Sequence, residues 1–100
     1  KSSQNVQFFL SSVDLYLRRR RIEKRSLVLI DPPRVGCSDF VIKSLAESEG
    51  LAIFYISCDP ARLSRDLKLF AKLGWRVRRA RLFDMFPQTH HIETLLELIR

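Results

Sequence analysis

A cysteine stands where an apolar run of the chain meets a helix. Residues 51–58 are apolar and rich in β-branched and aromatic side chains, and Cys58 ends the run. Asp59-Pro60 then open a helical pattern over 61–73, because proline favours the first turn of a helix. Open α/β sheets carry their chemistry at the carboxyl ends of strands, and a thiolate is a strong nucleophile toward carbon. We therefore predict that Cys58 is a nucleophile; the alternative is a small core residue.

Two further segments carry residues that suit the same edge of a sheet. Asp31 follows an apolar run and opens the sequence Asp-Pro-Pro-Arg, in which two prolines hold the carboxylate in a fixed direction. Arg34 closes that sequence and suits a phosphate or a base edge. Glu93 begins the last apolar segment and is a candidate general base. The alternatives are a helix-capping turn at Asp31 and an ordinary edge glutamate at Glu93.

The elements that must position these residues alternate between strand and helix. The patterns predict strands over 5–10, 27–30, 51–58 and 75–83, helices over 13–25, 38–48 and 61–73, and a last segment over 92–99 that is strand or helix. This order predicts an α/β domain with a largely parallel sheet. Residues 84–91 are too short for a parallel crossover, so the last two strands should be antiparallel. The strand that carries Glu93 would then begin at the end of the sheet where the strands before Asp31 and Cys58 finish.

Composition limits the classes of protein. Hydrophobic residues make up 46% of the chain, which is enough for a folded core. The apolar runs are of strand length and no signal peptide is visible, so we expect no membrane association. Cys37 and Cys58 have no repeated spacing, which favours two reduced thiols in a cytoplasmic protein. No third ligand is spaced to join His90 and His91, and we expect no metal.

The chain is strongly basic. Its formal net charge is +7 and its isoelectric point is near 10.1. The basic residues gather in two clusters: Arg18, Arg19, Arg20, Arg21, Lys24 and Arg25, and then Arg76, Arg78, Arg79 and Arg81. Such a charge attracts a polyanion, most plausibly nucleic acid. The alternative is a set of solvated surfaces that keep the protein soluble.

Three stretches together resemble the RNA 5-methyluridine methyltransferases, enzymes that depend on S-adenosylmethionine (SAM). They are Leu-Ile-Asp-Pro-Pro-Arg-Val-Gly (29–36), Tyr-Ile-Ser-Cys-Asp-Pro-Ala-Arg-Leu-Ser-Arg-Asp-Leu (55–67) and Phe-Asp-Met-Phe-Pro-Gln-Thr-His-His-Ile-Glu-Thr (83–94). The likeness covers about 27–100. It implies a Rossmann-like SAM-dependent methyltransferase sheet, of which this chain would form the carboxyl-terminal half.

The resemblance also implies a role for each site residue. Cys58 would attack carbon 6 of a uracil in tRNA or rRNA, so that carbon 5 can take the methyl group of SAM. Glu93 would remove the carbon 5 proton. Asp31 would contact SAM beside the target base, and Arg34 would help to hold the RNA. The base would have to leave its stack to reach the thiol.

The chain departs from this family in two respects. The family often has asparagine after the cysteine, where this chain has Asp59, which adds a negative charge beside the thiol. The glycine-rich SAM loop, the RNA-binding β-barrel and the iron–sulfur cysteines of the family have no match here. We expect 1–26 to form a strand and a basic helix, and 27–100 to form the motif-bearing half. Without its neighbours, 1–13 should be irregular, and the free edge of strand 27–30 should favour self-association.

Two other functions stay open. An RNA cytosine-5-methyltransferase also uses a cysteine, but is expected to carry Pro-Cys after the motif aspartate, where this chain has Pro33-Arg34. A non-catalytic RNA-binding fragment would be basic and folded and would lack a cofactor site.

Overall fold

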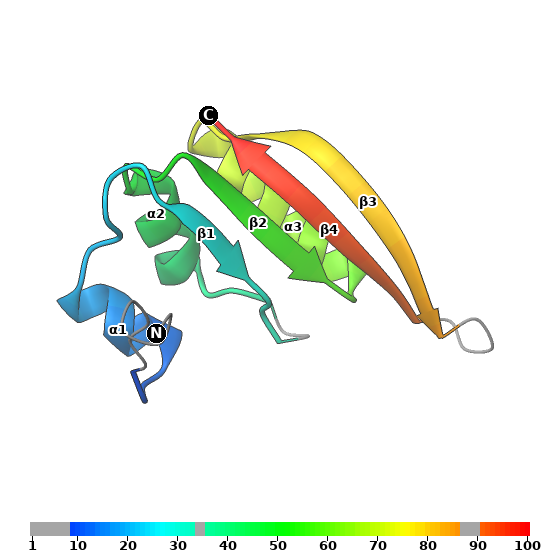
Figure 1. Cartoon of the computed structure of the whole chain (residues 1–100), viewed down its shortest axis with the longest axis horizontal. Coiled ribbons are helices and arrows are strands. Elements are labelled where there is room, and N and C mark those ends of the chain that lie inside the picture. The colour runs from blue at the N-terminus through cyan, green and yellow to red at the C-terminus, as the bar shows by residue number, and fades with distance from the viewer. Residues whose placement is uncertain (1–8, 34–35, 87–90) are drawn as a thin grey trace, which may run out of the picture.

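The computed structural model describes residues 9–33, 36–86 and 91–100, and they form a mixed sheet with helices packed against it (Figure 1). The elements are α1 (Val13–Arg19), β1 (Leu27–Ile30), α2 (Asp39–Glu47), β2 (Ala52–Ser57), α3 (Pro60–Lys72), β3 (Arg76–Phe86) and β4 (His91–Ile99). Within these residues no helix is both long and apolar enough to cross a membrane.

The four strands form one sheet in the order β1-β2-β4-β3. β1 and β2 are parallel, whereas β4 runs antiparallel to both β2 and β3. The prediction that the last two strands are antiparallel is confirmed. Residues 92–99, for which the sequence allowed a strand or a helix, form a strand. This segment forms a strand because it pairs with a strand on either side, β2 and β3, and because Leu96 and Leu98 are buried in the core there.

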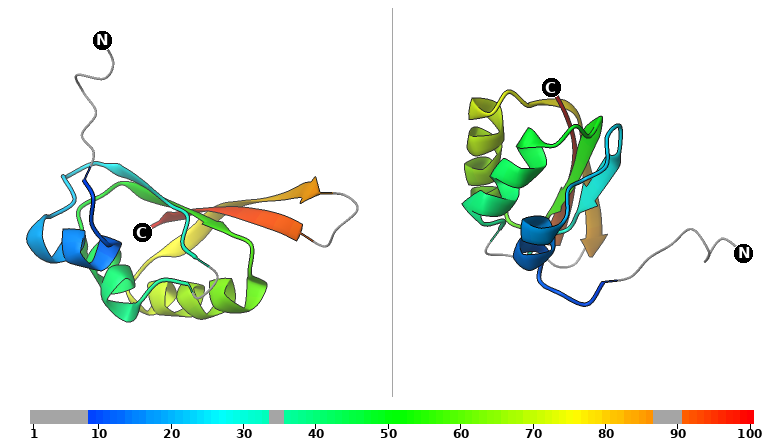
Figure 2. Two further views of the ribbon diagram at one scale, coloured as in Figure 1. Left: turned by 90° about the horizontal axis from the view of Figure 1, so that it is seen from below. Right: turned by 90° about the vertical axis from the view of Figure 1, so that its left-hand side faces the viewer.

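α2 and α3 pack on the same face of the sheet (Figure 2). The core between them and the sheet is apolar: Val41, Ile42, Leu45, Ile53, Tyr55, Phe70, Trp75, Leu96 and Leu98. On the opposite face, Leu27 and Leu29 are 67% and 66% exposed. They lie on β1, an edge strand of the described sheet. Self-association through this edge stays a prediction.

The first helix is shorter than predicted. It begins at Val13, where the Ser12 hydroxyl accepts a hydrogen bond from the Leu15 amide, and it ends at Arg19 rather than near residue 25. The chain after it is tied instead to the end of α2. The Arg25 amide donates to the Glu49 carbonyl at 2.9 Å, and the Leu51 amide donates to the Ser26 carbonyl at 2.7 Å. No residue of α1 is fully buried, although Leu17 packs against the core from outside, so tertiary packing gives little support to a longer helix.

The strand predicted over 5–10 is wrong at its described end. Phe9 and Leu10 lie in no strand, while residues 5–8 are outside the described part of the chain. Phe9 packs against α1 instead, with its ring centroid 5.1 Å from that of Tyr16. The described stretch before the helix is therefore irregular, as expected, but the helix begins at Val13, inside the range predicted to be irregular.

Candidate active site

Cys58 follows β2 directly and is exposed. The next residue, Asp59, turns its carboxylate into the amino end of α3, where it accepts hydrogen bonds from the Ala61 and Arg62 amides at 3.0 and 3.3 Å. Ser57 fixes the same turn, because its hydroxyl accepts from the Asp59 amide at 3.1 Å. The charge that Asp59 adds beside the thiol is therefore engaged as a helix cap.

The pairing of β2 with β4 relates Cys58 to Glu93. The register runs as far as Ser57 opposite Thr94. β2 ends at Ser57, and one further step in the same register would set Cys58 opposite Glu93; directly opposed residues of an antiparallel pair have Cβ atoms about 4.5–5.5 Å apart. Glu93 is half-buried and pairs on its other side with Phe83 of β3. A thiol and a carboxylate from segments far apart in sequence are thus brought to the same end of the sheet, on neighbouring strands.

Asp31 leaves β1 at the same edge. Ile30 lies opposite Tyr55 in the parallel register, so Asp31 follows at about the level of Ile56, two residues before Cys58. The Asp31 side chain is exposed. Arg34, the fourth predicted site residue, lies outside the described part of the chain. The structure therefore brings three of the four predicted residues to adjacent strand ends.

A cavity of about 860 Å³ opens at the carboxyl end of β1. Its lining includes Ile30, Asp31 and Pro32 from the strand end, Val13 and Asp14 from α1, and Arg62 from α3. The wall is mixed, with apolar surface beside three carboxylates (Asp14, Asp31 and Asp39) and the guanidinium groups of Arg62 and Arg65. Cys58 does not line this cavity, so a ligand held there would lie beside the thiol's strand and would have to extend toward it.

The second cysteine has a different environment. Cys37 is 8% exposed and belongs to the core cluster. Burial, and second the nearby Asp66 carboxylate, raise the pKa of Cys37 to about 11. Because a thiol must ionise to act as a nucleophile, Cys37 is inert near neutral pH. Cys58 is exposed.

We expect iodoacetamide at pH 8 to alkylate Cys58 much faster than Cys37. With a pKa of about 11, about one Cys37 thiol in a thousand is ionised at that pH. Raising the pH toward 11 should increase the Cys37 rate. Peptide mass spectrometry of the native full-length protein measures both rates, and equal labelling at pH 8 would contradict this account of the two thiols.

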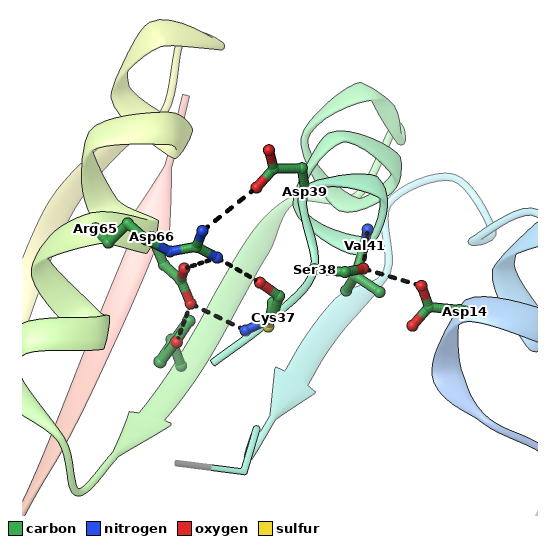
Figure 3. A network of polar contacts seen from close by, with 8 residues as sticks. Asp14, Cys37, Ser38, Asp39, Val41, Arg65 and Asp66 are labelled. Atoms are coloured by element: carbon green, nitrogen blue, oxygen red, sulfur yellow. Dashed lines mark hydrogen bonds and ion pairs between the residues drawn. The ribbon is translucent and has the colours of Figure 1, made fainter. Parts of the chain in front are cut away.

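Sequence reasoning missed a buried polar network beside the site (Figure 3). The Asp66 side chain is fully buried, and it accepts hydrogen bonds from the Tyr55 hydroxyl and from the Cys37 amide, the latter at 3.2 Å. Burial, and then the bond to Asp66, raise the pKa of Tyr55 above its usual value. A signal was available, because Asp66 interrupts the apolar stripe of α3 between Leu63 and Phe70.

Gly36 packs closely against this network. Its φ is +81°, and a Cβ there would lie 3.1 Å from Asp66 Oδ2 and 3.3 Å from Arg62 Nε. Gly74 offers a matched control, because its φ is +97° but a Cβ there would meet nothing within 4 Å.

We expect Gly36→Ala to lower the free energy of unfolding by more than Gly74→Ala does. Both variants bear the cost of the left-handed backbone, about 1–2 kcal/mol, and only Gly36→Ala adds a contact with Asp66. Denaturant unfolding of both proteins measures the difference. An equal loss in the two would mean that the loop yields freely around Gly36.

The two basic clusters lie apart. The first begins in the last turn of α1, which adjoins α2, and continues in the segment after it, whereas the second lies on β3, the far edge of the sheet (Figure 1). Arg18 lies over the Phe40 ring at 4.6 Å, and Arg78 lies 3.5 Å from Glu97.

A model of the tRNA (uracil-5-)-methyltransferase family matches residues 4–100. The chain belongs to this family. Relatives include an uncharacterized RNA methyltransferase of Bdellovibrio bacteriovorus, 43% identical over 97% of this chain, and another of Thermotoga maritima, 36% identical over 99%. The chain spans only 26% and 22% of these two proteins. The resemblance inferred from the three motifs is confirmed.

Solved structures extend the family assignment to the fold. The chain superposes with a TM-score of 0.78 and 30% identity on the Pyrococcus abyssi tRNA (uracil-54, C5)-methyltransferase in complex with S-adenosyl-L-homocysteine, covering 98% of this chain and 24% of that one. A SAM-dependent methyltransferase of Leishmania major shares the fold, with a TM-score of 0.61 and 16% identity. The predicted fold class, part of a SAM-dependent methyltransferase sheet, is confirmed.

Proposed function

We propose that the protein carrying this chain is a SAM-dependent RNA uracil-5-methyltransferase that acts on tRNA or rRNA, with Cys58 as nucleophile and Glu93 as base. The observation that supports the proposal is the register of β2 and β4, which pairs Ser57, directly before Cys58, with Thr94, directly after Glu93. Membership of the family supports the choice of uracil.

Each residue has one step in this reaction. The Cys58 thiolate adds to carbon 6 of the uracil, and the displaced electrons make carbon 5 nucleophilic. Carbon 5 then takes a methyl group. Glu93 removes the proton left on carbon 5, the double bond between carbons 5 and 6 re-forms, and the thiolate is expelled. The methyl group replaces that proton, and Cys58 is regenerated.

The residues present fit the cofactor that the family uses. SAM supplies an electrophilic methyl group on a positively charged sulfur. The cavity at the end of β1 offers apolar surface from Val13, Ile30 and Pro32 for a ring, and the Asp31 carboxylate as an acceptor for hydroxyl or ammonium groups. Asp14 is less available, because its carboxylate already accepts a hydrogen bond from Ser38 at 2.9 Å. We assign Asp31 as the cofactor-binding residue in this chain.

The substrate is an RNA whose target base leaves its stack, since a thiol at a strand edge cannot reach carbon 6 inside a helix. Arg34 is proposed to hold that RNA next to the site, and the net charge of +7 favours its approach. Among the described residues no cluster of histidine, cysteine and acidic side chains could hold a metal. We place the protein in the cytoplasm, a prediction that the two unbridged thiols support.

The test of this function is the identity of the product. Unmodified RNA is incubated with the full-length protein and methyl-labelled SAM, digested to nucleosides and separated. We expect label in 5-methyluridine. Label in 5-methylcytidine would move the assignment to cytosine, and RNA that binds without gaining label would favour a binding module.

A further inference from the structure

The loop that carries Asp31 is held at its far end by α3. Residues 31–38 connect β1 to α2. Near the end of this loop, the backbone amide and carbonyl of Cys37 both form hydrogen bonds with side chains of α3 (Figure 3). Its amide donates to Asp66 Oδ2 at 3.2 Å, and its carbonyl accepts from the Arg65 guanidinium at 2.8 Å. Two consecutive residues of α3 thus satisfy both polar groups of one loop residue.

Asp66 makes most of the contacts that hold this end of the loop. Its side chain is 0% exposed, and a buried carboxylate is costly unless it is paired and hydrogen-bonded. Oδ2 accepts from the Cys37 amide and from the Tyr55 hydroxyl of β2. Oδ1 finds no hydrogen bond among the described residues and relies on Arg65, whose guanidinium lies 3.3 Å away. Asp66 therefore links the loop to the helix and strand that flank Cys58.

Gly36, the residue before Cys37, also packs closely against Asp66. Gly36 comes so close that a Cβ would lie 3.1 Å from Oδ2. The Gly36 amide also donates to the Pro33 carbonyl at 2.8 Å. A shift of the Asp66 carboxylate would thus disturb Gly36 and, through that hydrogen bond, Pro33, which lies two residues after Asp31.

We propose that Asp66 is a positioning residue: through the Cys37 backbone and Tyr55 it fixes the loop that holds Asp31 beside Cys58. This inference rests on the proposed function and adds to it a residue that touches neither substrate nor cofactor. Tyr55 comes from β2, three residues before Cys58, so the same carboxylate ties the loop to the nucleophile's own strand.

The variants are chosen to separate positioning from stability. Asp66→Asn keeps the shape of the side chain and removes its charge pairing with Arg65. Tyr55→Phe removes a single hydroxyl and serves if Asp66→Asn folds poorly. Trp75→Phe is the matched control, because it deletes another buried hydrogen bond, from Trp75 Nε1 to the Ala46 carbonyl at 3.0 Å, at the other end of the sheet.

The first measurement is hydrogen exchange in the full-length protein. We expect Asp66→Asn to speed exchange of the Gly36 and Cys37 amides about tenfold or more, with β2 unchanged. Tyr55→Phe should give a smaller effect in the same direction, and Trp75→Phe should leave both amides as they are. If the Gly36 and Cys37 amides exchange at the native rate in both Asp66→Asn and Tyr55→Phe, the proposal that Asp66 anchors the loop is wrong.

The second measurement is the rate of methyl transfer, well below the melting temperature of every variant. We expect Asp66→Asn to slow transfer about tenfold in the native background and less than about twofold in the Asp31→Asn background, because neighbours that act as one unit are non-additive. The same loss in both backgrounds would show that Asp66 acts only on stability and would overturn the positioning role. If the native protein transfers no methyl group, the proposed function fails, while hydrogen exchange still decides whether Asp66 anchors the loop.

Discussion

Cys58→Ala should abolish methyl transfer to RNA while leaving RNA binding intact. The exposed thiol forms the only covalent bond between protein and base in the proposed reaction. Removing it should lower the rate by about a thousandfold or more, as the loss of a nucleophile does in other enzymes. The measurement is the single-turnover rate with saturating RNA, beside a filter-binding measurement of RNA affinity.

The second cysteine supplies the control for that result. Cys37→Ala removes a buried thiol of the core cluster and leaves Cys58 in place. It is expected to lower stability, because a buried side chain is shortened, and to retain methyl transfer. If Cys37→Ala abolishes transfer and Cys58→Ala does not, the assignment of the nucleophile is wrong.

Glu93→Gln should stall the reaction after the methyl group has been transferred. The base is needed only to remove the carbon 5 proton, so its loss should slow turnover by about 10²–10⁴-fold while the bond between Cys58 and carbon 6 still forms. A methylated protein–RNA adduct should therefore accumulate with ordinary uridine. A denaturing gel with methyl-labelled SAM detects it as labelled RNA that migrates with the protein.

Glu97→Gln is the matched control on the same strand. Glu97 lies four residues further along β4, is half-buried, and lies close to Arg78 and Arg79 at 3.5 and 3.9 Å. It should retain turnover and show no adduct. Adduct in neither variant, with turnover lost only in Glu93→Gln, would place Glu93 before the covalent step and refute its role as the late base.

The sequence was enough to predict that Asp31, Cys58 and Glu93 lie at the same end of the sheet, because that placement depends on where strands end and on the length of one connection. Strand ends are marked by Asp31 and by Cys58 before a proline-initiated helix, and the short connection before Glu93 requires an antiparallel return. The pairing of β4 between β2 and β3 could not be read from the chain. Its leucines and glutamates favour helix, and only the strands on either side make it a strand.

What sequence reasoning missed depends on contacts between distant segments. The predicted helix from Val13 continued through the arginines because arginine is a good helix former. It ends at Arg19 because the chain after it forms hydrogen bonds with Glu49 and Leu51, in the segment that follows α2. Asp66 was not singled out, since its partners lie 11 and 29 residues away.

The most direct test of the central claim is a covalent trap. The full-length protein is incubated with SAM and RNA carrying 5-fluorouridine, whose fluorine cannot be removed by Glu93, and the mixture is run on a denaturing gel. The account predicts a stable protein–RNA adduct that maps to Cys58 by peptide mass spectrometry and is absent in Cys58→Ala. An adduct that persists in Cys58→Ala, or none from native protein on RNA that it binds, would contradict the account.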